Sequence, residues 1–87
     1  MPTLTLFGAT WCQPCQKLKP EIQNLQRELA QTCKFRYVNV DEEEDLCVAE
    51  GVTHVPYVKI THDEQVLMSE VNPPIKRVKD VLTSCCT

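Results

Sequence analysis

The feature that most constrains this chain is a pair of cysteines, Cys12 and Cys15, separated by two residues and placed just after a short apolar run. Residues 3–7 alternate leucine with threonine and are followed by Gly8, which predicts a short strand. Because a helical pattern begins at the pair, the two thiols stand where a strand passes into a helix. Cys12 then lies among the unpaired N–H groups of the first helical turn, and Cys15 lies one turn along on the same face.

Thiol chemistry suits this position, since only the ionised sulfur is nucleophilic and a cysteine in water is mostly protonated at neutral pH. The positive end of a helix stabilises an anion, and its N–H groups bond to it directly. We therefore predict that Cys12 attacks and that Cys15, further into the helix and more shielded, resolves a mixed disulfide. Pro14 fits a first helical turn, and Trp11 supplies a flat apolar flank beside the sulfur.

A metal site is the competing interpretation of a C-x-x-C motif. Four further cysteines could complete one: Cys33, Cys47, Cys85 and Cys86. They form no second C-x-x-C, however, and the two histidines are not at zinc-finger spacing. The sequence therefore favours redox chemistry and predicts neither a bound metal nor a cofactor.

The four other cysteines are expected to be thiols, with Cys33 and Cys47 in or near the core. Cys85 and Cys86 could be oxidised, couple two chains or fray, and the sequence leaves this open. Six cysteines would also suit a secreted disulfide framework. Because the start of the chain lacks the basic residues and long apolar core of a signal peptide, we expect a reducing compartment, the cytoplasm.

Length and charge further restrict the class of protein to which this chain can belong. Eighty-seven residues predict a single domain, residues 1–87, and we expect a monomer. The net charge of −3 argues against a nucleic-acid partner. No segment approaches the roughly 18 apolar residues of a membrane span, so we expect no membrane association.

The pattern of residues in the rest of the chain predicts further strands and helices. An amphipathic helix is expected over 12–30 with Pro20 inside it, and a buried strand over 35–40. The acidic run 41–45 should open a second helix that Gly51 ends, with a calcium or partner site as the minor interpretation. Two strands follow at 55–60 and 65–71, then a last helix begins at 72–74. The order β-α-β-α-β-β-α predicts an α/β fold with a four-stranded mixed sheet and helices on both faces.

At this point the chain resembles the thioredoxin family. The segment Trp11-Cys12-Gln13-Pro14-Cys15 is similar to the family's Trp-Cys-Gly-Pro-Cys, and Pro20 stands where thioredoxins carry a helix-kinking proline. Residues 38–41 resemble a family strand, and residues 51–56 resemble the segment that ends in a cis-proline. The resemblance implies a minimal thioredoxin fold in which Pro56 is cis, packs against the disulfide and lets the backbone of Val55 pair with a substrate. Most X-Pro bonds in folded proteins are trans, so the local sequence by itself favours a trans Pro56. A proline at the first residue of a strand is the alternative interpretation.

Three departures from the family pattern stand out. Leu6 occupies the position of an acidic residue that is proposed to relay the proton of the resolving thiol, so another group or water must do so. Asn72 replaces a glycine after the last strand and should change the substrate groove. The first strand and helix of longer thioredoxins are missing, which makes the architecture as short as that of a glutaredoxin.

The resemblance implies a thiol-disulfide oxidoreductase that reduces disulfide-containing protein substrates and is recycled by thioredoxin reductase or another electron donor. The implied catalytic residues are Cys12 and Cys15, and the implied substrate-binding residues are Trp11, Gln13, Pro14, Val55, Pro56 and Asn72. Two alternatives stay open. A glutathione-dependent, glutaredoxin-like enzyme fits the length, yet no Lys or Arg precedes Lys17 to bind the tripeptide's carboxylates. A non-catalytic docking or metal-binding module is the other.

Overall fold

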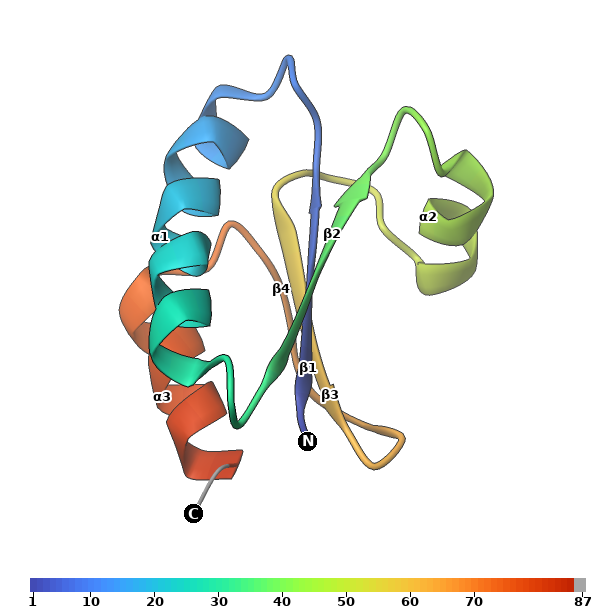
Figure 1. The fold of residues 1–87 in the computed structure, drawn as a ribbon. Helices are drawn as coiled ribbons and strands as arrows, with labels where there is room; N and C mark the ends of the chain where they lie inside the picture. The colour runs from blue at the N-terminus through green and yellow to red at the C-terminus, as the bar shows by residue number, and fades with distance from the viewer. Residues whose placement is uncertain (86–87) are drawn as a thin grey trace.

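The computed structural model describes residues 1–85, the last of them by its backbone alone. The elements appear in the predicted order (Figure 1): β1 (Thr3–Gly8), α1 (Gln13–Leu29), β2 (Lys34–Asn39), α2 (Glu44–Glu50), β3 (Tyr57–His62), β4 (Gln65–Val71) and α3 (Ile75–Cys85). The expectations for the side chains of Cys85 and Cys86 lie outside the described residues. Within the described part of the chain, no helix combines the length and the apolar character needed to cross a bilayer.

The four strands form one mixed sheet in the order β2-β1-β3-β4. β1 pairs in parallel with β2 and antiparallel with β3, and β3 pairs antiparallel with β4. Figure 1 shows α1 and α3 side by side on one face of the sheet and α2 on the other side. The predicted thioredoxin fold, with helices on both faces, is confirmed.

Alternation along the strands builds a core on each face. Leu4 and Leu6 of β1 are buried on the α1 and α3 side, whereas Phe7 is buried on the α2 side. The larger cluster adds residues of α1, β3 and α3, chiefly Leu18, Ile22, Leu25, Val58, Ile60, Val78 and Leu82. In the smaller cluster, Phe7 meets the Tyr57 ring edge-to-face at 5.8 Å between centroids. Two apolar interfaces therefore fix the central strand, which leads directly to the cysteines.

Several predicted boundaries were wrong by a few residues: the starts of α2 and α3, and both ends of β3, which spans Tyr57–His62 instead of 55–60. Helix α2 begins at Glu44, so only Glu44 and Asp45 of the acidic run occupy its first turn, and residues 41–43 form the loop before it. β3 begins at Tyr57 instead of residue 55, because a proline at position 56 cannot donate a hydrogen bond to a strand ladder. Gly51 does end α2, with φ of 73° in the left-handed region.

The two connections around β4 use left-handed backbone without glycine. Asp63 and Glu64 form the turn between β3 and β4 with φ values of 50° and 69°. Asn72 follows β4 with φ of 47°. Asparagine tolerates this region better than most residues, which explains how it stands in the place of the family's glycine.

Candidate active site

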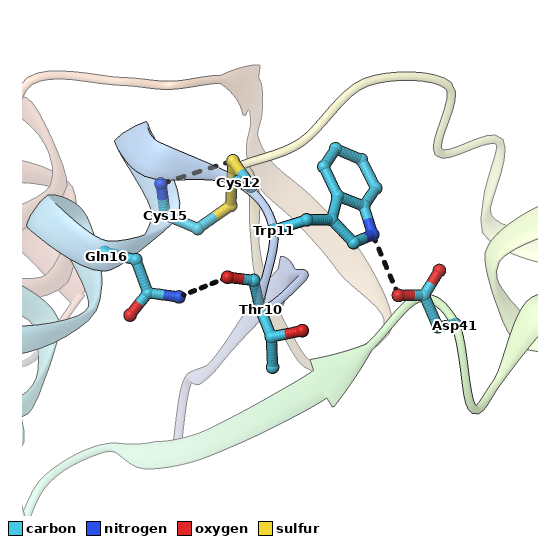
Figure 2. The surroundings of a disulfide bond; sticks show 6 residues. All are labelled: Thr10, Trp11, Cys12, Cys15, Gln16 and Asp41. Carbon is cyan, nitrogen blue, oxygen red and sulfur yellow. Dashed lines mark hydrogen bonds between the residues drawn. A yellow bond between two sulfur atoms is a disulfide. The ribbon is translucent and has the colours of Figure 1, made fainter.

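Cys12 and Cys15 form a disulfide at the N-terminus of α1 (Figure 2). Cys12 is the N-cap of the helix, in extended conformation, and its Sγ accepts a hydrogen bond of 3.3 Å from the backbone N–H of Cys15. Their Cα atoms lie 5.3 Å apart. The sulfur of Cys12 thus occupies the position in which a helix N-terminus stabilises negative charge, as the sequence predicted.

Both cysteines are buried, with 6% of Cys12 and 5% of Cys15 exposed. They pack with Ala9 and with the half-buried Val40 and Val55. We expected Cys15 to be more shielded than Cys12. In this oxidised state the two residues are almost equally buried, because the disulfide holds both sulfurs in one apolar cluster.

Trp11 lies beside the disulfide with 67% of its surface exposed, and its indole N–H donates to the Asp41 carboxylate at 2.8 Å (Figure 2). Asp41 is itself held by its backbone N–H, which donates to the Asn39 side chain at 2.9 Å. This contact was not predicted, because the acidic run also fits the first turn of a helix. The parallel pairing of β1 and β2 could have indicated it, because the segments after two parallel strands emerge at the same edge of a sheet.

The resemblance to thioredoxins implied a cis-proline next to the cysteines, and the Val55–Pro56 peptide bond is cis. Pro56 is fully buried, and Val55 packs against the cysteine cluster. The backbone N–H of Asn72 donates to the Pro56 carbonyl at 2.7 Å, which ties the end of β4 to this loop. Three segments far apart in the sequence therefore meet at the disulfide.

Five of the six predicted substrate-binding residues line two hollows near the disulfide, whereas Pro56 is fully buried and lines neither. Gln13, Pro14 and Asn72 line one hollow of about 550 Å³, together with Lys17 and other residues of α1 and the segment before α3. Trp11 and Val55 line a second hollow of about 370 Å³, together with Val40, Cys47, Val52, Thr53 and His54. Neither Cys12 nor Cys15 lines these two hollows; the first includes the two residues between the cysteines, and the second includes Val40 and Val55, which pack against the cysteine cluster.

A third hollow, of about 450 Å³, reaches Cys15 from the β2 side. Leu6 lines it at the position where the family resemblance placed an acid, so β1 presents no carboxylate to Cys15. The polar side chains that share this hollow with Cys15 come from other elements and include Gln16, Lys19, Glu42 and Glu43. The ammonium of Lys19 lies 5.6 Å from the centre of the Tyr37 ring. Water and these groups are the available routes for the Cys15 proton.

Cys33 and Cys47 are buried, which confirms their predicted place in the core. Burial raises the pKa of the Cys47 thiol, and the nearby carboxylates of Glu43 and Glu44 raise it further. Among residues 1–85, no three His, Cys, Asp or Glu side chains come together as metal ligands would.

A dithiol at a helix N-terminus, following the central strand of a mixed sheet, defines a redox-type α/β domain. The family model described as thioredoxin matches residues 1–84. This chain belongs to the thioredoxin family.

The similar proteins agree with this assignment. A thioredoxin of Listeria monocytogenes is 34% identical over 64 residues, which cover 74% of this chain and 62% of that protein. A thioredoxin of Bacillus subtilis is 29% identical over 75% of this chain and 62% of its own length. A solved mutant thioredoxin from Halobacterium salinarum superposes with a TM-score of 0.87 at 31% identity, covering 99% of this chain and 75% of that one. The matched regions thus span less than two thirds of the length of these curated relatives.

Proposed function

We propose that this chain is a thiol-disulfide oxidoreductase that reduces protein disulfides through Cys12 and Cys15. The observation that carries the proposal is the disulfide at the N-cap of α1, where the Cys12 sulfur accepts an N–H bond from the first turn. The same hydrogen bond stabilises a Cys12 thiolate after reduction, so the reduced protein holds a nucleophile at neutral pH.

The reaction takes two exchanges. The Cys12 thiolate attacks one sulfur of a substrate disulfide, which forms a mixed disulfide and releases the other substrate sulfur as a thiolate. Cys15 then loses its proton to water or a neighbouring group and attacks the Cys12 sulfur, which forms the Cys12–Cys15 disulfide and releases the second substrate thiolate. Two electrons pass from the dithiol to the substrate, and the two released thiolates take up protons from solvent.

Around the disulfide, we assign the substrate contacts to Trp11, Gln13, Pro14, Val55, Pro56 and Asn72. Five of these residues line hollows near the disulfide, and Pro56 forms the cis peptide bond with Val55, which packs against the cysteines. These positions support the assignment, since a substrate segment must pass over Cys12 to present its sulfur. The backbone of Val55 is the element that pairs with an extended substrate. The protein acts as a monomer in a reducing compartment such as the cytoplasm.

Trapping tests the mechanism. A Cys15→Ser variant incubated with a disulfide-bonded protein should accumulate a covalent adduct through Cys12, because the second exchange is blocked. The matched Cys12→Ser variant keeps Cys15 and should form no such adduct. Absence of an adduct with Cys15→Ser, or equal adducts with both variants, would contradict the proposed roles.

The electron donor is tested by reconstitution. With thioredoxin reductase and NADPH the oxidised protein should be re-reduced and turn over, whereas glutathione with glutathione reductase should support little turnover. Lys17 is the earliest cation in the chain, so the site offers few charges to hold the carboxylates of glutathione. Faster turnover with glutathione would instead identify a glutaredoxin-like enzyme.

A further inference from the structure

One side of the disulfide combines an apolar hollow with a concentrated negative charge. The hollow lined by Trp11, Val40, Val52 and Val55 continues into the cysteine cluster, because Val40 and Val55 belong to both. The indole of Trp11 bridges from this hollow to Asp41, the first residue of the acidic run 41–45. A segment that reaches the disulfide across this hollow therefore passes beside the acidic run.

The acidic run is exposed along its whole length. None of the ion pairs found within residues 1–85 includes one of its carboxylates; the lysines and arginines in those pairs meet Glu28, Glu50 and Glu70. The full chain has nine basic residues and twelve acidic ones, of which seven lie outside the run. Without the run the chain would carry an excess of two positive charges, so its net negative charge resides at this one rim of the active site.

The opposite side of the disulfide lacks this bias. The hollow lined by Gln13, Pro14 and Asn72 contains one cation, Lys17, and one carboxylate, Glu21. In the hollow that includes Cys15, two carboxylates of the acidic run, Glu42 and Glu43, are accompanied by one basic residue, Lys19. The electrostatic surroundings of the disulfide are therefore asymmetric across the path of a substrate.

We propose that the hollow between Trp11 and residues 52–55 receives an apolar side chain next to the substrate's reacting cysteine, and that the acidic run selects substrates with lysine or arginine on that side. This inference rests on the proposed reductase function and names its substrate class. The apolar hollow supplies contact area, and the five carboxylates raise the encounter rate and fix the direction in which the segment lies.

Matched peptide disulfides test the inference. Three peptides share a leucine beside the reacting cysteine and differ only in the next positions, which carry lysines, serines or glutamates. At low ionic strength, kcat/KM should fall in the order lysine, serine, glutamate, with about a tenfold difference between the ends of the series. In about 1 M salt the three values should converge, because charges are then screened beyond about 3 Å.

Variants locate the source of the preference. Glu42→Gln with Glu43→Gln should reduce the lysine-to-glutamate ratio to about threefold, since two of the five charges are removed. The matched control, Glu64→Gln with Asp80→Asn, removes two exposed carboxylates elsewhere and should leave the ratio unchanged. A further peptide with serine in place of the leucine should react several-fold more slowly than its parent in high salt, where only the apolar contact remains.

The possible outcomes distinguish the substrate selectivity from the proposed reductase function on which it rests. Efficient and equal reduction of the lysine and glutamate peptides would overturn the selectivity and leave the reductase function standing. A lysine-to-glutamate ratio that stays at its full value in high salt or in the Glu42→Gln, Glu43→Gln variant would also overturn it, because the acidic run would not be the source of the preference. Failure to reduce any of the peptides, including the one that carries serines next to the leucine, would overturn the proposed reductase function itself.

Discussion

At the scale of single residues, the hydrogen bond from Trp11 to Asp41 joins the loop after β1 to the loop after β2. Each partner is exposed, so the bond orients the indole more than it stabilises the fold. The chain has one tryptophan, so fluorescence excited selectively at tryptophan reports on the surroundings of Trp11.

Replacing Asp41 tests that orientation. Asp41→Leu removes the acceptor and should increase the mobility of the indole, seen as lower fluorescence anisotropy, with a loss of stability of no more than about 1 kcal/mol. Asp41→Asn keeps an acceptor oxygen without the charge and should retain most of the anisotropy. Equal losses in the two variants would show that the charge, and not the hydrogen bond, holds the ring.

A second residue-scale prediction concerns Cys47, whose thiol pKa is raised by burial and by Glu43 and Glu44. The folded state therefore holds this proton at pH values where the unfolded chain has released it. The stabilisation is complete below the ordinary thiol pKa, about 8.5, and is lost as pH rises toward the raised value.

We expect the difference in unfolding free energy between the native protein and a Cys47→Ser variant to shrink from about pH 7 to about pH 10. Tyr37, whose pKa is also raised by burial, is present in both proteins and cancels in the comparison. Chemical denaturation at a series of pH values measures the difference. A gap that stays constant or widens would contradict the burial of a neutral thiol.

At the scale of the elements, left-handed backbone at Gly51 and at the β3–β4 turn sets where elements end. At Gly51 an added β-carbon would meet nothing within 4 Å, so a substitution there costs conformational energy only. At the turn, Asp63 and Glu64 take the same region with side chains present. Left-handed backbone is therefore unstrained at Gly51, which has no β-carbon, and strained at Asp63 and Glu64, which have one.

Glu64→Gly should therefore stabilise the protein by about 0.5–1 kcal/mol, because an Asp-Gly pair suits a turn with two positive φ values. Gly51→Ala should destabilise it by about 1–2 kcal/mol, the cost of a β-carbon in left-handed backbone. Thermal unfolding of both variants measures the effects. Shifts of the same sign would show that backbone conformation does not control these two positions.

At the scale of the whole molecule, the larger cluster links the sheet to both α1 and α3. Leu82 of α3 is fully buried within it, whereas Val48 of α2 is 81% exposed. We expect Leu82→Ala to lower the unfolding free energy by about 2–5 kcal/mol in a single cooperative transition, and Val48→Ala to change it by less than about 0.5 kcal/mol. Denaturation followed by circular dichroism and by Trp11 fluorescence should give coincident curves; separate transitions would show that α3 unfolds apart from the active-site end.

Much of this molecule was predictable from its residues. Apolar periodicity located α1 and α3, residue composition located the strands, and the acidic run with Gly51 located α2. The change from strand to helix at Cys12 placed the two cysteines at a helix start. The geometry of Pro56 came from the family resemblance, because the local pattern favours trans. The predicted boundaries near residues 41–45 and 55–56 were wrong, since acidic residues suit a loop as well as a first turn and Pro56 cannot donate to a strand ladder. The pairing of Trp11 with Asp41 depends on two strands lying side by side, and no local pattern encodes it.

The turn between β3 and β4 lies at the end of the sheet opposite the disulfide, since β3 pairs Tyr57 with Phe7 near the cysteines and Thr61 with Thr3 at the far end. A dye, an affinity tag or a tether inserted between Asp63 and Glu64 would therefore sit about the full length of a strand away from Cys12. Immobilised through that turn, the domain would display its dithiol outward, ready to capture partners from solution.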